Sequence, residues 1–196
     1  MRVYPEITTS DVQTGDIMLE ATKGILPSLI HFFQFLWYWT LKRRTPLYAW
    51  EMNHAGWFNK QHGFLHISES VARGIVNNPI WLRKKKKGKI KRILVGKLKQ
   101  PLANDQENYL NIYAVANVGK HKYGFVQLLV MYPLYIIVKV FWGKVVWFES
   151  LAKGVPCGEW MAIAINNILH IFKYPKRFMP VEALSYEEFD WFELKM

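Results

Sequence analysis

The chain has 196 residues, of which 51% are hydrophobic and 21% are charged, so it can bury one ordinary core and is not a disordered protein. Its 26 Lys and Arg residues outnumber its 15 Asp and Glu residues, which gives a net charge of +11 with histidine neutral. The single cysteine, Cys157, excludes an intrachain disulfide framework and a zinc site built from several cysteines.

The predicted elements, in chain order, are short strands flanked by helices. Strands are expected at 15–20, 48–58, 63–68 and 89–98. Helices are expected at 26–42, 104–117, 125–139 (broken at Pro133) and 156–172. A turn is expected at 59–63 and an irregular piece at 74–82. Because strands and helices are segregated, the predicted class is α+β. We expect a single domain over 1–196, with its core at about 14–170 and a C-terminal extension at 171–196.

Two apolar stretches, 25–41 and 125–142, are interrupted by polar residues or proline. We interpret them as buried or interface-lying helices and not as membrane spans. The N-terminal residues show no apolar core with a small-residue cleavage site, so no signal peptide is expected. We therefore expect a cytoplasmic or peripherally membrane-attached protein; packaging into a virion or release by lysis is compatible with the same sequence.

Cys157 is predicted to lie in the first turn of the last long helix, directly after Gly154, Val155 and Pro156. At that place the helix dipole and unpaired N–H groups stabilise a thiolate, and the same N–H groups can form part of an oxyanion hole. The alternative is that Cys157 only fills the core, since free cysteines are among the most buried residue types.

A nucleophilic thiol needs a base, and the chain has six histidines. His54 lies beside Ala55 and Gly56, whose small side chains leave space around the imidazole. Glu69 ends the next strand, where a carboxylate can orient a histidine, and His66 lies on that strand within reach of His54. The alternatives are a core histidine at 54 and a solvated carboxylate at 69. The remaining histidines, 31, 62, 121 and 170, are expected to be packed or solvated.

Five short motifs follow one another along residues 14–170. They are Gly15-Asp16-Ile17-Met18-Leu19, Asn53-His54-Ala55-Gly56-Trp57-Phe58, Ile67-Ser68-Glu69-Ser70, Tyr123-Gly124-Phe125 and Cys157-Gly158-Glu159-Trp160. In this order they resemble the circularly permuted, NlpC-type branch of the papain-like cysteine hydrolases, of the YiiX/YaeF kind. The resemblance implies a small antiparallel sheet packed against the cysteine-bearing helix. The chain departs from that family at Gly158, where the family usually has a serine.

The resemblance implies hydrolysis of an amide bond, in a cell-wall peptide or a similar substrate, through an acyl-enzyme. Cys157 would be the nucleophile, His54 the base and Glu69 the residue that orients His54. Asp16 and Tyr123 would support or line the site. His66 is the alternative orienter, because in a regular strand Glu69 shares a face with the apolar residues at 65 and 67, unless a bulge or strand end at 68 turns it.

The alternative functions are a lipid acyltransferase or esterase at a membrane surface, and a catalytically idle binding or structural module, for example phage-encoded, that retains the fold. No cofactor is expected, and no metal, because no His or Cys spacing matches a known metal site. The expected partner is therefore a substrate with an amide or ester bond. The sequence does not indicate an oligomeric state.

A run of basic residues lies in the middle of the chain, at Arg83, Lys84, Lys85, Lys86 and Lys87. It is expected either to attract an anionic membrane or cell-wall polymer, or to be a solvated loop before an edge strand. Nucleic-acid binding is not expected, because aromatic residues are not interleaved with the basic ones as a stacking platform requires.

Overall fold

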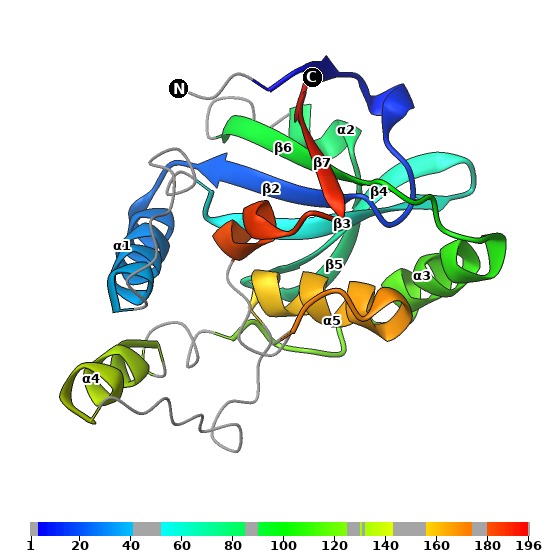
Figure 1. Ribbon diagram of the computed structural model, residues 1–196. Coiled ribbons are helices and arrows are strands. Elements are labelled where there is room, and N and C mark those ends of the chain that lie inside the picture. Colours follow the sequence, from blue (N-terminus) through cyan, green and yellow to red (C-terminus); the bar gives the residue numbers. More distant parts are fainter. Residues whose placement is uncertain are drawn as a thin grey trace.

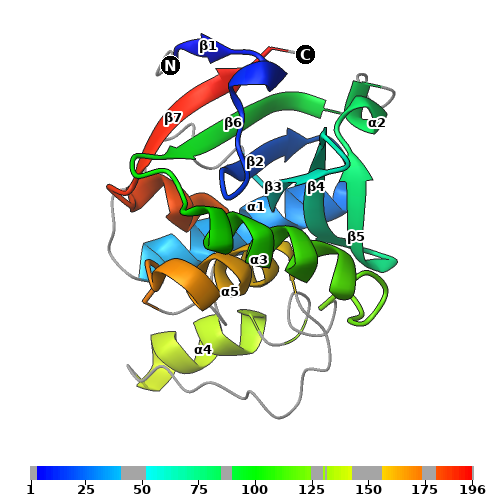
Figure 2. The same ribbon diagram turned by 90° about the vertical axis from the view of Figure 1, so that its right-hand side faces the viewer.

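A seven-stranded sheet forms the centre of the molecule, with helices α3 and α5 side by side against one face (Figures 1 and 2). The computed structural model describes residues 4–40, 52–84, 90–124, 130, 132–142, 156–173 and 180–195. The strands are β1 (Glu6–Ile7), β2 (Ile17–Thr22), β3 (His54–Gln61), β4 (Phe64–Val71), β5 (Gly74–Pro79), β6 (Ile90–Leu98) and β7 (Phe189–Leu194). The helices are α1 (Ile25–Thr40), α2 (Trp81–Lys84), α3 (Asn104–Ala116), α4 (Tyr132–Trp142) and α5 (Cys157–Leu169). Two 3-10 helices lie at Thr9–Asp11 and Pro180–Ser185.

The strand order is β1-β7-β6-β2-β3-β4-β5, and every neighbouring pair is antiparallel except β1 with β7. Strand β2 lies at the centre, so both of its faces are buried. Ile17 and Leu19 point into the main core under α3 and α5, whereas Met18 belongs to a second apolar cluster with Phe58 and Ile67 on the other face. The chain therefore has the α+β architecture that its segregated elements predict.

The β3–β4 hairpin has a two-residue turn, His62 and Gly63, shorter than the turn predicted at 59–63. Their φ angles of 50° and 79° are both positive, as a type I′ turn requires. This turn matches the twist of the strands, so β3 continues to Gln61 and pairs regularly with β4. The pairing places Gly56 opposite Glu69.

Three strands differ from the sequence-based expectation, and the first is the short β1, which lies where no strand was predicted. Residues 74–79, expected to be irregular, form β5, which pairs with β4 along its full length although it contains two asparagines and a proline. Residues 189–194, for which no strand was predicted, form β7 beside β6. Strand β7 depends on non-local pairing with β6. Strand β5 pairs with the preceding strand β4 through a short turn and forms despite the poor β propensity of its asparagines and proline.

Pro133 was expected to break a helix at 125–139. It lies instead in the first turn of α4, where a missing N–H leaves no helical hydrogen bond unmade. Of the basic run, Arg83 and Lys84 belong to α2, and Lys85, Lys86 and Lys87 lie outside the described residues. No helix in the described part of the chain is long and apolar enough to cross a membrane.

Asp16 fastens the start of β2 to the neighbouring chain segments. One oxygen of its buried carboxylate accepts the N–H of Gln13 at 2.8 Å, and the other accepts the N–H of Leu98 at 3.2 Å. Burial raises the pKa of Asp16 to about 6 against the effect of these hydrogen bonds. Its backbone carbonyl accepts the N–H of Phe58, whereas His54 pairs with the opposite end of β2, at Glu20.

Replacing Asp16 with alanine leaves two backbone N–H groups without their acceptor. We expect Asp16→Ala to lower the free energy of unfolding by about 2 kcal/mol, measured by urea denaturation. Asp190→Ala is the matched control, because the Asp190 carboxylate is 60% exposed and lies 3.9 Å from Lys99 Nζ; it should change stability by less than about 0.5 kcal/mol. Unchanged stability in Asp16→Ala would contradict this structural role.

Candidate active site

His54 and Glu69 meet on one face of the β3–β4 hairpin. His54 is the first residue of β3, and Glu69 lies opposite Gly56, two residues further along. Residues two apart on a strand share a face, so His54 and Glu69 are diagonal neighbours. His54 Nε2 lies 2.5 Å from Glu69 Oε2, and the Glu69 side chain is 2% exposed.

This contact needs no irregularity in β4. The strand pairs in register with both neighbours through Ser68, so the bulge considered from the sequence is absent at that position. Glu69 does share a face with Ile67, as regular alternation requires. His54 lies on the same face, and this puts the carboxylate beside the imidazole.

Gly56 allows β3 and β4 to approach closely beside His54 and Glu69. A Cβ atom at position 56 would lie 2.8 Å from the carbonyl oxygen of Ser68 and 3.3 Å from the Cβ of Glu69. The first contact is with backbone, so any side chain would force β4 away from β3. Gly56, two residues after His54, is therefore needed to hold Glu69 against the imidazole.

Cys157 is the first residue of α5, as predicted. Pro156 precedes it with φ −63° and ψ 159°, and its carbonyl accepts the N–H of Trp160 at 2.9 Å. The indole N–H of Trp160 donates to Ser68 Oγ at 3.2 Å, which ties the helix to the strand that carries Glu69. The Cys157 side chain is 3% exposed.

Cys157 and His54 interact directly and form a buried pair. Burial alone would raise the pKa of the thiol and lower that of the imidazole. Their mutual attraction and hydrogen bond outweigh burial, so the pKa of Cys157 is lowered and that of His54 is raised to about 10. The N–H groups of Ala55 and Gly158 also hydrogen-bond to the sulfur, and Glu69 stabilises the imidazolium. Both shifts favour the thiolate–imidazolium form over the neutral pair.

Tyr123 also contacts the sulfur. Its hydroxyl hydrogen-bonds to Cys157, and burial together with the nearby thiolate raises the pKa of Tyr123 above its ordinary value. The phenol therefore stays protonated and acts as a donor towards the sulfur. The structure thus brings Tyr123 into the site, where the sequence motifs had placed it.

A cavity of about 200 Å³ opens in front of His54, Glu69 and Tyr123. Its remaining lining residues come from β2, α1 and the ends of β3 and β4, and are Glu20, Thr22, Pro27, Ile30, Asn53, Ser70, Val71 and Ala72. Glu20 was not predicted as a site residue. It is 1% exposed and pairs directly with His54 across β2 and β3, so it adds a second buried carboxylate to the cavity.

Asn53 fixes the entry of the chain into β3. Its Oδ1 accepts the hydroxyl of Thr22 at 2.7 Å, and its Nδ2 donates to the Thr22 carbonyl at 3.0 Å. Asn53 Nδ2 also lies 2.9 Å from His31 Nε2, which joins α1 to the sheet beside His54. His31 is thus a packed residue in contact with Asn53, which precedes His54.

Two predicted candidates do not reach this cavity. His66 lies three residues before Glu69 and therefore on the opposite face of β4, where its ring packs edge-on against Trp81 at 6.2 Å. Asp16 lies at the far end of β2, where it holds backbone N–H groups. The residue in contact with His54 is Glu69.

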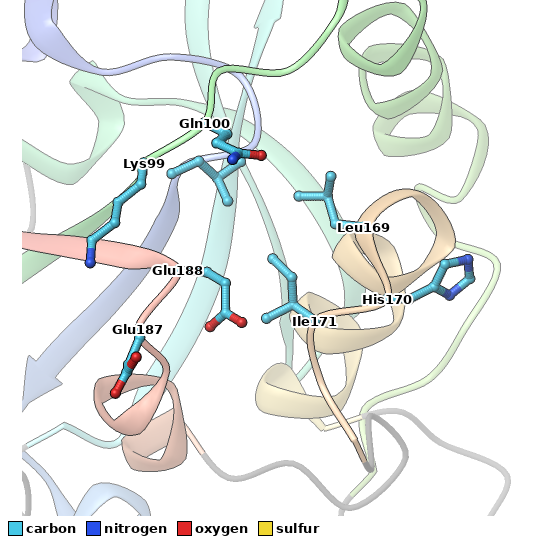
Figure 3. A pocket seen from close by; sticks show the side chains of 8 residues that line it. Lys99, Gln100, Leu169, His170, Ile171, Glu187 and Glu188 are labelled. Atoms are coloured by element: carbon cyan, nitrogen blue, oxygen red, sulfur yellow. The ribbon is translucent and has the colours of Figure 1, made fainter.

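A larger cavity, of about 490 Å³, lies at the other end of α5 (Figure 3). It is lined by Leu98, Lys99, Gln100, Leu169, His170, Ile171, Glu187 and Glu188. Figure 3 shows that His170 points away from the two glutamates. Because a 13-residue helix is about 20 Å long, this cavity is separate from the thiol at the start of α5.

Comparison with known proteins places the chain by its fold. No protein-family profile matches the sequence, and no curated protein matches it. Among solved structures, the chain shares its fold with the metalloprotein YiiX from Escherichia coli O157:H7. The TM-score is 0.51 and the identity 15%, over 92% of this chain and 96% of YiiX. The similarity therefore shows a shared α+β fold, and the activity has to be argued from the site.

YiiX is described as a metalloprotein. Among the residues described in the present chain, no group of three or more His, Cys, Asp or Glu side chains is arranged to hold a metal ion. We assign no metal ligand set to these residues.

The contact between Glu69 and His54 predicts which residue orients the imidazole. Glu69→Gln removes a negative charge beside the imidazolium, which lowers the pKa of His54 and raises that of Cys157. We expect the rate of Cys157 alkylation by iodoacetamide at about pH 6 to fall roughly tenfold. His66→Gln, three residues away on the same strand, should leave the rate unchanged. The reverse pattern would identify His66 as the orienting residue.

Proposed function

We propose that this protein is a cysteine hydrolase that cleaves an amide bond, in a cell-wall peptide or a similar substrate, through an acyl-enzyme on Cys157. The observation that carries the proposal is the continuous contact from Cys157 through His54 to Glu69. A nucleophile, a base and an orienting carboxylate are the three parts that thiol hydrolysis requires. The YiiX-like fold is compatible with the proposal but does not establish it.

In the first step the thiolate of Cys157 attacks the carbonyl carbon of the substrate, and the carbonyl oxygen becomes an oxyanion. N–H groups in the first turn of α5 and the hydroxyl of Tyr123 supply hydrogen-bond donors near the sulfur. Glu69 holds Nε2 of His54, which leaves Nδ1 to face the sulfur. The imidazolium donates its Nδ1 proton to the leaving amine, and a thioester remains.

In the second step neutral His54 takes a proton from water as the hydroxide part adds to the thioester carbonyl. The tetrahedral intermediate collapses, a carboxylic acid leaves, and the thiolate–imidazolium pair is restored. Gly158 stands where the resembled family has a serine. Residue 158 donates its backbone N–H to the sulfur, so a glycine at this position preserves the hydrogen bond.

Ester hydrolysis or acyl transfer on a lipid is a second candidate function. It is favoured by Pro27 and Ile30, two apolar residues of α1 that line the cavity beside His54. The same thiol chemistry serves an amide and an ester, so the two functions differ in the substrate and not in the catalytic residues.

The state of the thiol can be tested without knowing the substrate, because Cys157 is the only cysteine and every labelled thiol reports it. An ordinary thiol, with a pKa of about 8.5, is less than about 1% ionised at pH 6. We expect the folded protein at pH 6 to react with iodoacetamide at least about tenfold faster than the same chain in urea. His54→Gln should abolish this advantage and move the midpoint of the rate profile towards the ordinary thiol value.

A folded protein that reacts more slowly than the unfolded chain at pH 6 would contradict the catalytic proposal, since Cys157 would then be an inert core thiol. The small reagent is essential to this comparison, because the Cys157 side chain is 3% exposed.

The substrate class can be tested with cell-wall peptide fragments and with acyl esters, including phospholipids. We expect release of amine and carboxylate from the peptide amides, abolished in Cys157→Ala. Tyr123→Phe removes one donor from the oxyanion and should lower kcat about a hundredfold with little change in KM. Cleavage of lipid esters alone would establish the second candidate. A reactive thiol with no turnover of either class would indicate a fold-retaining binding module.

A further inference from the structure

The outward faces of α1 and α4 are apolar. On α1 the exposed large residues are Ile25, Leu29, Phe32 and Phe35, and on α4 they are Leu134, Ile137, Val140 and Phe141. The exposed fractions reach 85% at Ile25 and 74% at Phe141. Spacings of three and four residues place each set along one side of its helix. A helix of a water-soluble surface shows the opposite pattern, with its apolar side inward.

The orientation of α1 is fixed by contacts on its inner side. Ile30 and Gln34 are buried, and the Gln34 side-chain amide donates to the carbonyl of Met52 at 2.9 Å. His31 lies against Asn53. Phe32 and Phe35, by contrast, are 54% and 52% exposed.

Helices α1 and α4 contact each other and lie together on one side of the molecule, away from α3 (Figure 1). We define the α1–α4 face as the eight exposed residues named above, which lie on two helices in contact with each other. Adjoining apolar surface of this kind is rare on monomeric soluble proteins and marks a site of interaction.

The chain around both helices carries positive charge only. Residues 21–50 contain no Asp or Glu but have Lys23, Lys42, Arg43 and Arg44. Residues 108–148 likewise contain no Asp or Glu but have Lys120, Lys122, Lys139 and Lys144. Apolar side chains on helices whose flanking chain segments are rich in basic residues are the combination that an anionic lipid surface attracts.

Helix α3 shows that exposure alone does not produce this combination. It also exposes apolar residues, Ile112 and Val115 among them, but Asp105 and Glu107 lie in its first turn. A second copy of the chain fits the α1–α4 face poorly, because pairing two such faces would bring like charges together.

We propose that the α1–α4 face docks on an anionic lipid bilayer, with its exposed side chains at the boundary between headgroups and acyl chains. The basic residues that neighbour the two helices in the sequence supply the attraction to the headgroups. Pro27 and Ile30 line the cavity beside His54, so the helix that docks also forms a wall of the candidate active site. The docking surface goes beyond the proposed hydrolysis and does not depend on the thiol chemistry.

The test is co-sedimentation of the full chain with vesicles of phosphatidylcholine containing about 30% phosphatidylserine, and with phosphatidylcholine alone. We expect binding to the anionic vesicles, weakened by about 0.5 M salt because screening reduces the attraction to the headgroups. Phe32→Ser with Phe35→Ser should weaken binding about tenfold or more, and so should Ile137→Ser with Phe141→Ser. If the double variant on α1 does not fold, the double variant on α4 still tests the proposal.

The matched control is Ile112→Ser with Val115→Ser on α3, which removes exposed apolar residues of comparable size and should leave binding unchanged. The proposal would be overturned if the α3 control lost as much vesicle binding as the α1 and α4 variants. It would also be overturned if both of those variants bound normally, or if the unmodified chain did not bind anionic vesicles. A lipid-free dimer that the same pairs dissociate would assign the face to a second copy. Cys157→Ser should bind vesicles as the unmodified chain does, so failure of the hydrolase proposal is distinguishable from failure of this one.

Discussion

The attraction between the Cys157 thiolate and the His54 imidazolium is the interaction on which the candidate site depends. Neither charge would persist alone in a buried place, because desolvation favours the neutral form of each group. Glu69 and two backbone N–H groups lie at hydrogen-bond range and favour these charges against desolvation. Everything that positions these groups, from the start of α5 to the β3–β4 register, therefore contributes to the ionisation state of the thiol.

The core holds the two halves of this pair in place. The base and its carboxylate belong to the sheet, whereas the nucleophile belongs to the helix packed across it. Trp160 connects the two layers: its ring stacks on Tyr113 with centroids 5.2 Å apart, and its N–H bonds to Ser68. The packing of the Trp160 ring, together with its N–H hydrogen bond, thus fixes the start of α5 against β4, the strand that carries Glu69.

Much of the site could be predicted from the sequence, because its chemistry depends on local features. A cysteine at a helix start, a histidine among small residues and the order of the motifs led to Cys157, His54, Glu69 and Tyr123, which the structure brings together. Glu20 could not be predicted in the same way, because it reaches the cavity through its pairing with β3. For the same reason β7 was missed, since it pairs with β6, a strand distant in the sequence. Strand β5 was missed because its asparagines and proline give it a poor local β propensity.

The two-residue turn at His62 and Gly63 controls the site from the far end of the hairpin. Because side chains alternate along a strand, a shift of one residue in the pairing moves every side chain of β4 to the other face. The carboxylate would then leave the imidazole and a serine would take its place. The length of a solvent-facing turn is thus a determinant of proton transfer at a buried thiol. Loop insertions, which most surface turns tolerate, should at this turn behave like substitutions of an active-site residue.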